Sequence, residues 1–182
     1  MGELHLIIGP MFAGKTTLLI NKANSICENL KSEEMMVINH SSDSRYCENT
    51  FVSSHDKIKI PCIAMTHLNT IFNNTNNISN INYIFINEGQ FFPDLYDCIK
   101  KLLFEYNKII YICGLDGDYK QEPFQNCKLL DLIPYSSSVV KLTAKCYSCK
   151  KKAPFTKRII NSTDIVLVGG SESYQPVCID HL

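Results

Sequence analysis

The sequence lacks an excess of charge of either sign, because 18 basic and 18 acidic residues cancel over 182 residues. No net positive field therefore favours general nucleic-acid binding. No apolar run reaches the roughly 18 residues that a membrane-spanning helix needs. The first residues carry an early acid and no basic stretch, unlike a signal peptide. We therefore expect a cytoplasmic protein that binds neither nucleic acid nor a membrane.

Hydrophobic residues make up 45% of the chain and charged residues 20%, which is typical of a globular protein and excludes disorder. The length suits one compact domain, or one domain with a small module. The nine cysteines are an odd number, so they cannot all pair. In a reducing compartment we expect them to be core thiols, metal ligands or nucleophiles. Cys27, Cys98 and Cys113 lie in apolar stretches and are predicted to be buried in the core.

Hydrophobic patterning predicts an α/β fold. A helix is expected from about Lys15, and another from Pro93 with Asp94 stabilising its N-terminus. Loops are expected over residues 41–57 and 73–77. Buried strands are expected over residues 3–8, 35–38, 81–86, 108–113 and 138–142. Such alternation predicts a mostly parallel sheet with helices on both faces.

The character of the sequence changes after about Thr143. Cysteines, a run of basic residues and short strand-like pieces replace the helical pattern. We therefore predict two domains, a larger α/β domain over residues 1–142 and a smaller domain over residues 143–182.

A phosphate-binding motif follows the first predicted strand and precedes the first predicted helix. The eight residues from Gly9 to Thr16 match G-x-x-x-x-G-K-[ST], in the strand-then-helix context that this loop requires. Its glycines let backbone N–H groups turn toward phosphate oxygens at the positive end of the helix. Lys15 is expected to reach the β- and γ-phosphates of ATP, and the Thr16 hydroxyl to ligate Mg²⁺. The predicted ATP-binding residues are Gly9, Pro10, Met11, Phe12, Ala13, Gly14, Lys15, Thr16 and Thr17.

Polar residues also follow the apolar strand that ends at Ile86. In phosphate-binding-loop proteins this position supplies the acid that helps to hold Mg²⁺, and often a catalytic carboxylate. Glu88 is the candidate base. Asn87 can accept a hydrogen bond from a metal-bound water, but it brings no charge to the metal.

Two short pairs of metal-ligand residues lie in the C-terminal region. Cys146 and Cys149 are followed by Cys178 and His181, each pair with a two-residue spacer. Thiolate and imidazole are preferred ligands of tetrahedral zinc, and four protein ligands leave no open position. We therefore predict a structural Zn²⁺, with residues 150–177 folding as a separate hairpin or loop.

Seven ordered segments make the chain resemble the cellular and poxviral type of thymidine kinase. They are GPMFAGKTT, DSRY, NEGQFFPD, LDGDYKQEPF, SVVKLTAKC, FTKRI and VGGSESYQPVC, beginning at residues 9, 43, 87, 115, 138, 155 and 168. The resemblance implies a P-loop parallel sheet plus a zinc-containing lasso domain. It also implies transfer of the γ-phosphate of ATP to the 5′-hydroxyl of thymidine with Mg²⁺, a homotetramer, and feedback inhibition by dTTP. The Asn- and Ile-rich composition is similar to that of a protein encoded by an AT-rich viral genome. If the protein is viral, it is expected to act in the host cytoplasm.

The same resemblance implies roles for individual residues. Glu88 would accept the proton of the 5′-hydroxyl, while Arg45 would contact phosphate oxygens and Asp43 would support the phosphate and metal region. Met11 and Thr156 would line the space around the thymine methyl group. The other residues implied to contact the nucleoside are Phe91, Leu115, Tyr119, Phe124, Val166, Val168, Gly169 and Tyr174.

Two positions depart from the family pattern. Asn87 stands where the family usually has aspartate, and Tyr119 stands where it usually has phenylalanine. The first departure leaves open a nucleoside-binding protein that has lost catalysis. A zinc-ribbon ATPase that acts on nucleic acid is a further alternative, which the neutral charge disfavours.

Overall fold

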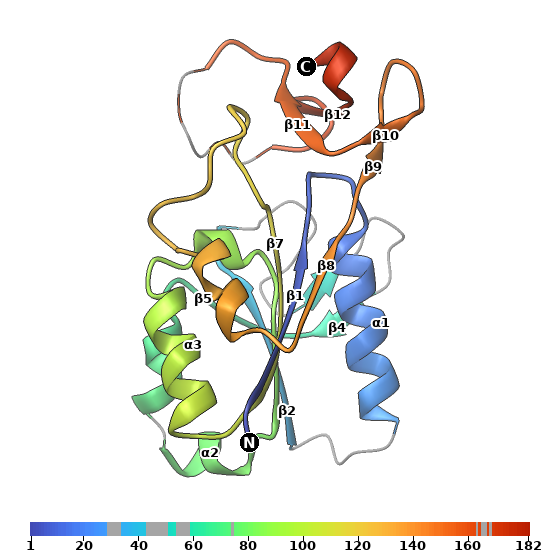
Figure 1. Ribbon diagram of the computed structural model, residues 1–182. Coiled ribbons are helices and arrows are strands. Elements are labelled where there is room, and N and C mark those ends of the chain that lie inside the picture. The colour runs from blue at the N-terminus through green and yellow to red at the C-terminus, as the bar shows by residue number, and fades with distance from the viewer. Residues whose placement is uncertain are drawn as a thin grey trace.

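The computed structural model describes residues 1–28, 34–42, 51–53, 59–73, 75–162, 164, 167 and 169–182. Its centre is a six-stranded sheet in the order β5-β2-β6-β7-β1-β8, in which all neighbouring strands are parallel (Figure 1). The strands are β1 (Glu3–Ile8), β2 (Met35–His40), β5 (Ile63–Met65), β6 (Tyr83–Ile86), β7 (Ile109–Gly114) and β8 (Ser138–Lys141). The predicted α/β fold with a parallel sheet is confirmed.

Helices cover both faces of this sheet. Helix α1 (Lys15–Cys27) lies on one face and α3 (Leu95–Phe104) on the other, beside the 3₁₀ helix η4 (Leu130–Tyr135) (Figure 1). Successive side chains of a strand point to opposite faces, so β1 contributes to two cores. Leu4 and Leu6 pack in the core that contains α3, and Ile7 packs in the core of α1.

Two predicted loops contain regular structure. The Asn-rich stretch forms α2 (Thr75–Asn80), because burial of Ile78 outweighs the weak helix propensity of its neighbours. Within the predicted loop over 41–57, β3 (Phe51–Ser53) pairs with β4 (Lys59–Pro61). Residues 43–50 and 54–58 lie outside the described residues.

Asp94 connects the predicted helix to a second helix. It is the N-cap residue of α3; its side chain makes no capping bond to the backbone of that helix, but it accepts a hydrogen bond from the Cys98 thiol of α3 at 3.6 Å. Its carboxylate accepts hydrogen bonds from the backbone N–H groups of Leu68 (3.0 Å) and Asn69 (2.8 Å), at the start of the 3₁₀ helix η2 (Leu68–Asn73). The first turn of η2 has no acidic residue of its own, so Asp94 supplies one and joins the two helices.

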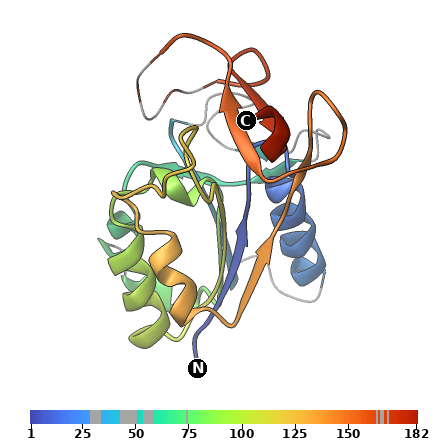
Figure 2. The ribbon, with the colours of Figure 1, turned by 45° about the horizontal axis from the view of Figure 1, so that its top comes forward.

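The C-terminal strands lie over the carboxyl ends of β1 and β7, at the end of the sheet opposite the N-terminus (Figures 1 and 2). Strands β9 (Ala144–Lys145) and β10 (Lys152–Ala153) form one antiparallel pair, and β11 (Phe155–Arg158) and β12 (Tyr174–Val177) form another. The short 3₁₀ helix η5 (Ile179–His181) follows. Ala13 of the predicted phosphate-binding loop packs against their small core. The carboxyl ends of parallel strands are where open α/β sheets bind ligands.

The prediction that Cys27, Cys98 and Cys113 are buried in the core is confirmed in part. Cys98 and Cys113 are buried, whereas Cys27 is half-buried. No helix among the described residues is both long and apolar enough to cross a membrane.

Candidate active site

The loop after β1 has a backbone that requires glycine at two positions. Gly9 has a φ of 147°, and an added Cβ would lie 2.4 Å from the carbonyl oxygen of Leu142. Gly14 has a φ of 83° and is the N-cap residue of α1. Other residues rarely adopt these backbone conformations, and the contact at Gly9 leaves no room for a side chain. The spacing of the motif therefore reflects the shape of the loop.

The loop brings a positive charge to the N-terminus of α1. Lys15 is buried, and its ammonium group donates a hydrogen bond to the carbonyl of Pro10 at 2.7 Å. The first turn of α1 contains no acidic residue, so no carboxylate of that turn occupies the positive end of the helix dipole. Backbone N–H groups, a helix N-terminus and a lysine together suit a phosphate group.

Four side chains, from α1, β2, β7 and the residue after β6, form a largely buried network beside the loop. The Thr16 hydroxyl donates a hydrogen bond to Asn87 Oδ1 at 3.1 Å, and the Cys113 thiol donates to the same oxygen at 3.0 Å. Asn87 Nδ2 donates in turn to Asn39 Oδ1 at 2.9 Å. Asn87 is only 1% exposed. The amide oxygen of Asn87 thus receives two donors, which fixes the direction of the Thr16 hydroxyl.

Glu88 follows Asn87 in a left-handed backbone conformation, with φ 54° and ψ 45°. The amide of Gln90 donates to the Glu88 carboxylate at 2.6 Å. The same amide accepts a hydrogen bond from the backbone N–H of Leu115 at 3.0 Å. Gln90 is buried and therefore holds the carboxylate in register with the loop after β7.

Cys113, at the end of β7, lies close to both predicted catalytic charges. Burial raises the pKa of its thiol to about 12; the carboxylate of Glu88 also raises this pKa, and the ammonium group of Lys15 lowers it. Strand β7 lies between β6 and β1 in the sheet. The lysine of the loop and the acid after β6 therefore face the same region, and Cys113 keeps its proton.

The phosphate-binding loop is joined to the C-terminal strands by a buried hydrogen bond. The backbone N–H of Met11 donates to the Thr156 hydroxyl at 3.0 Å. Beside this bond is a pocket of about 90 Å³ that Pro10 and Thr156 line together with Asp116 and Lys141. Lys141 and Asp116 form an ion pair at 2.8 Å.

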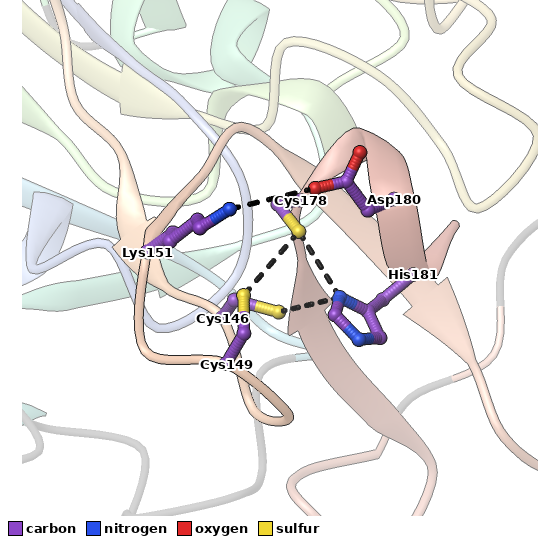
Figure 3. Close-up of polar contacts among 6 residues, drawn as sticks. All are labelled: Cys146, Cys149, Lys151, Cys178, Asp180 and His181. Carbon is purple, nitrogen blue, oxygen red and sulfur yellow. Dashed lines mark hydrogen bonds and ion pairs between the residues drawn. The ribbon is translucent and has the colours of Figure 1, made fainter.

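The predicted zinc ligands come together. Sγ of Cys146, Cys149 and Cys178 and a ring nitrogen of His181 all lie within 4.8 Å of one another. Figure 3 shows the sulfur atoms and the imidazole facing one another, from the turn after β9 and the end of β12. Cys149 and Cys178 sulfurs are 3.6 Å apart, and His181 Nδ1 lies 3.2 Å from the Cys178 sulfur. An ion pair of 3.8 Å between Lys151 and Asp180 joins the same two segments.

These separations fit a tetrahedral metal. With Zn–S bonds of about 2.3 Å, two thiolate ligands of one zinc lie about 3.8 Å apart. Hydrogen bonds to the Cys146 sulfur, first that of the Cys149 backbone N–H, lower the pKa of Cys146 to about 6. Thiolate is the form that binds metal. The four residues therefore fit a structural Zn²⁺.

Known proteins match the chain over nearly its whole length. The profile of the family described as Thymidine kinase matches residues 2–182. The chain belongs to the thymidine kinase family. The thymidine kinase of Oryza sativa subsp. japonica is 40% identical over 182 residues, which cover 99% of this chain and 66% of the rice protein. Those of vaccinia virus (strain Western Reserve) and monkeypox virus are each 39% identical over 177 residues, which cover 97% of this chain and 94% of each viral protein.

The remaining predicted site residues of this thymidine kinase family member lie in three segments: after β6, after β7, and before and at the start of β12. Phe91 ends the 3₁₀ helix η3 (Gly89–Phe91), directly after β6. Leu115, Tyr119 and Phe124 follow β7, and Phe124 packs against the main core. Gly169 and Tyr174 lie before and at the start of β12. Four predicted residues lie outside the described residues: Asp43, Arg45, Val166 and Val168.

Three residues that contact predicted site residues were not themselves predicted from the sequence as part of the site. Asn39 contacts Asn87, and Gln90 contacts Glu88. Arg158 contacts both Tyr119 and Tyr174. Gln90 and Arg158 lie inside motifs that carried the family resemblance, so motif membership was their signal. Asn39 lies at the end of β2, outside every motif, and only the sheet order brings it to Asn87.

Proposed function

We propose that this protein transfers the γ-phosphate of ATP to the 5′-hydroxyl of thymidine, giving dTMP and ADP. One observation supports the proposal most directly: Lys15, bonded to the carbonyl of Pro10 in the loop after β1, and Glu88, held by Gln90 after β6, lie at the carboxyl ends of the two strands that flank β7. Phosphoryl transfer depends on positioning and charge stabilisation more than on covalent chemistry. A lysine and a carboxylate placed on either side of β7 meet that requirement.

Each part of the site has a role in this reaction. Residues Gly9–Thr17 bind the triphosphate through backbone N–H groups and the Lys15 ammonium. Glu88 accepts the proton of the 5′-hydroxyl at a carboxylate oxygen, while Gln90 holds that carboxylate in place. Asp43 and Arg45, which lie outside the described residues, are proposed to act on the phosphates.

Thr16, at the start of α1, and Asn87, directly after β6, suit Mg²⁺ bound with ATP. Thr16 gives its proton to Asn87, so lone pairs of its oxygen remain for a metal. Asn87 orients that oxygen without bringing a charge. Mg²⁺ supplies neutralisation of the β- and γ-phosphate charge when it is bound.

The nucleoside is proposed to lie between the loop after β7 and the segment before β12. Phe91, Leu115, Tyr119 and Phe124 supply apolar walls, with Met11 and Thr156 near the thymine methyl group. Backbone groups of the segment that contains Val166, Val168, Gly169 and Tyr174 read the base. A wrong base would leave a buried polar group unpaired, at about 1–3 kcal/mol per group.

Further properties are proposed from the family resemblance. They are a homotetramer, feedback inhibition by dTTP, action in the cytoplasm, and a division into domains at residues 142 and 143. The small separate core of β9–β12 supports that division. Light scattering and the inhibition of turnover by dTTP test the first two.

Replacing Glu88 with glutamine tests the mechanism. We expect kcat for thymidine phosphorylation to fall by about 10²–10⁴-fold, because the general base is lost. Binding of ATP and of thymidine, measured by calorimetry, is expected to stay within about threefold of the wild type. Glu105→Gln, at an exposed position after α3, is the matched control and is expected to leave kcat unchanged. A loss below tenfold for Glu88→Gln would remove the base assignment.

The two alternative functions predict other results. A catalytically impaired nucleoside-binding homologue would bind thymidine but form no dTMP at any Mg²⁺ concentration. A zinc-ribbon ATPase would hydrolyse ATP in the absence of nucleoside, and DNA would stimulate it. Chromatography of the products from ATP with thymidine, with DNA or with neither separates these outcomes.

A further inference from the structure

Arg158, the last residue of β11, contacts two segments that are distant in sequence. Its guanidinium carbon lies 3.9 Å from the centroid of the Tyr119 ring, in the loop after β7. It also lies 5.3 Å from the centroid of the Tyr174 ring, at the start of β12. The proposed function places both tyrosines at the nucleoside, but it gives Arg158 no role.

Hydrogen bonds extend these contacts into the segment between β11 and β12. Arg158 Nη2 donates to the Tyr174 hydroxyl at 2.8 Å, and that hydroxyl donates to the Leu167 carbonyl at 2.8 Å. Arg158 Nη1 donates to the carbonyl of Ser162 at 3.1 Å and to the carbonyl of Asp164. The side chain thus holds carbonyl groups at several points of this segment, directly or through Tyr174.

The chemistry of these contacts suits arginine alone. A guanidinium group is planar, so it can stack on an aromatic ring while its in-plane N–H groups donate to several acceptors. Lysine keeps the charge but has neither the plane nor the fork of donors. Arg158 is half-buried and Tyr174 is buried, so the contact between these two side chains is largely shielded from solvent.

We propose that Arg158 is a positioning residue for nucleoside binding. It holds Ser162 and Asp164, and through Tyr174 also Leu167, in place while it contacts Tyr119, so that the backbone of Gly169 and Tyr174, proposed to read the base, is in place before the nucleoside arrives. Without it, nucleoside binding must also order the segment, and affinity falls. The proposal rests on the proposed function, and it assigns Arg158 no contact with the nucleoside, ATP or the transferred phosphate.

Arg158→Lys tests this role, with Lys157→Met as its matched control. Lys157 is the exposed neighbour on β11 and donates to the carbonyl of His181 instead. For Arg158→Lys we expect the KM for thymidine and its Kd in calorimetry to rise about tenfold or more. The KM for ATP and kcat at saturating thymidine should stay within about threefold. An unchanged thymidine Kd, an equal rise in the KM for ATP, or an equal effect of Lys157→Met would overturn the proposal.

A second variant tests whether Arg158 acts through Tyr174. Tyr174→Phe removes only the hydroxyl that joins Arg158 to Leu167. If the two side chains act together, the double variant loses little more thymidine affinity than the weaker-binding single variant. Multiplied losses would overturn the coupling. Tyr174→Phe alone does not decide, because Tyr174 is itself proposed to contact the nucleoside. If Arg158→Lys lowers the zinc content or the Tm, all four proteins are compared at full zinc loading, and multiplied losses of thymidine affinity then overturn the proposal.

The wild-type protein separates this proposal from the proposed function. If the wild type forms no dTMP, the proposed function fails, and the thymidine Kd values still decide the role of Arg158. If it forms dTMP and both variants bind thymidine as it does, only the Arg158 proposal fails. A wild type that binds no thymidine contradicts both.

Discussion

At the scale of single residues, Asn87 organises the proposed metal end of the site without carrying a charge. Its oxygen accepts from Thr16 and Cys113, and its nitrogen donates to Asn39. An aspartate could keep the first two bonds, but its second carboxylate oxygen would face Oδ1, the side-chain amide oxygen of Asn39. The neutral side chain therefore matches its buried neighbours better than an aspartate would.

The substitution Asn87→Asp is predicted to raise the affinity for Mg²⁺ and to lower the free energy of unfolding. The new charge beside Thr16 should lower the Mg²⁺ concentration for half-maximal activity about three- to tenfold, equivalent to about 0.6–1.4 kcal/mol. The free energy of unfolding should fall by about 1–3 kcal/mol, because Asn39 loses its donor. Magnesium titrations of turnover and urea unfolding measure the two effects.

Asn87→Leu is the control, since it removes the acceptor of Thr16 without adding a charge. It should raise the Mg²⁺ requirement. An Asn87→Asp variant with unchanged magnesium dependence would show that position 87 does not influence the metal.

At the scale of elements, a buried hydrogen bond joins the phosphate-binding loop to β11. It runs from the Met11 backbone N–H to the Thr156 hydroxyl, and both residues are largely buried. Ala13 adds an apolar contact between the same loop and the small core of the C-terminal strands. Because the two proposed substrates bind on either side of this contact, a change there should alter the KM values for both ATP and thymidine.

Thr156→Val keeps the shape of the side chain and removes its hydroxyl. We expect the free energy of unfolding to fall by about 1–3 kcal/mol, since the Met11 N–H loses its acceptor. The KM values for ATP and for thymidine should both rise, which distinguishes this variant from Arg158→Lys. Steady-state kinetics with each substrate varied measure both, and Thr143→Val, at an exposed position nearby, should change neither. A rise in only one KM would contradict a shared contact.

At the scale of the whole molecule, the C-terminal module, which comprises the strands β9 to β12 and the described residues that connect them, covers the end of the sheet where the phosphate-binding loop and Glu88 lie. Its four zinc-ligand residues come from the two ends of a long segment. Closing such a segment costs entropy, and a metal at its ends offsets that cost.

Removing the metal is predicted to affect nucleoside binding first. Zinc chelation, or Cys149→Ser, should lower the Tm and raise the KM for thymidine more than the KM for ATP. The phosphate-binding loop lies between β1 and α1 and contacts the C-terminal strands through Met11 and Ala13, so we expect the KM for ATP to rise less than the KM for thymidine. Metal analysis by mass spectrometry, thermal unfolding and kinetics test this together. Cys27→Ser, at a half-buried cysteine outside the cluster, should retain the metal; equal increases of both KM values in Cys149→Ser would contradict the prediction.

The sequence by itself determined the features that depend on short-range order. Strand positions follow from apolar runs, the phosphate-binding loop from glycines whose φ values no other residue easily adopts, and the zinc ligands from two-residue spacers. The predicted strands over 3–8 and 138–142 match β1 and β8 to within one residue. Each of these signals lies within a few neighbouring residues.

Only the tertiary structure decided which distant residues meet. The strand order brings Asn39 of β2 to Asn87 after β6, and the packing of α3 beside η2 lets Asp94, the N-cap of α3, also bind the start of η2. Burial of Ile78 made a helix where local propensity favoured a loop. Arg158 reaches Tyr119 only because the C-terminal strands fold back over the sheet. Such contacts depend on burial and on packing between elements, and no short stretch of sequence encodes them.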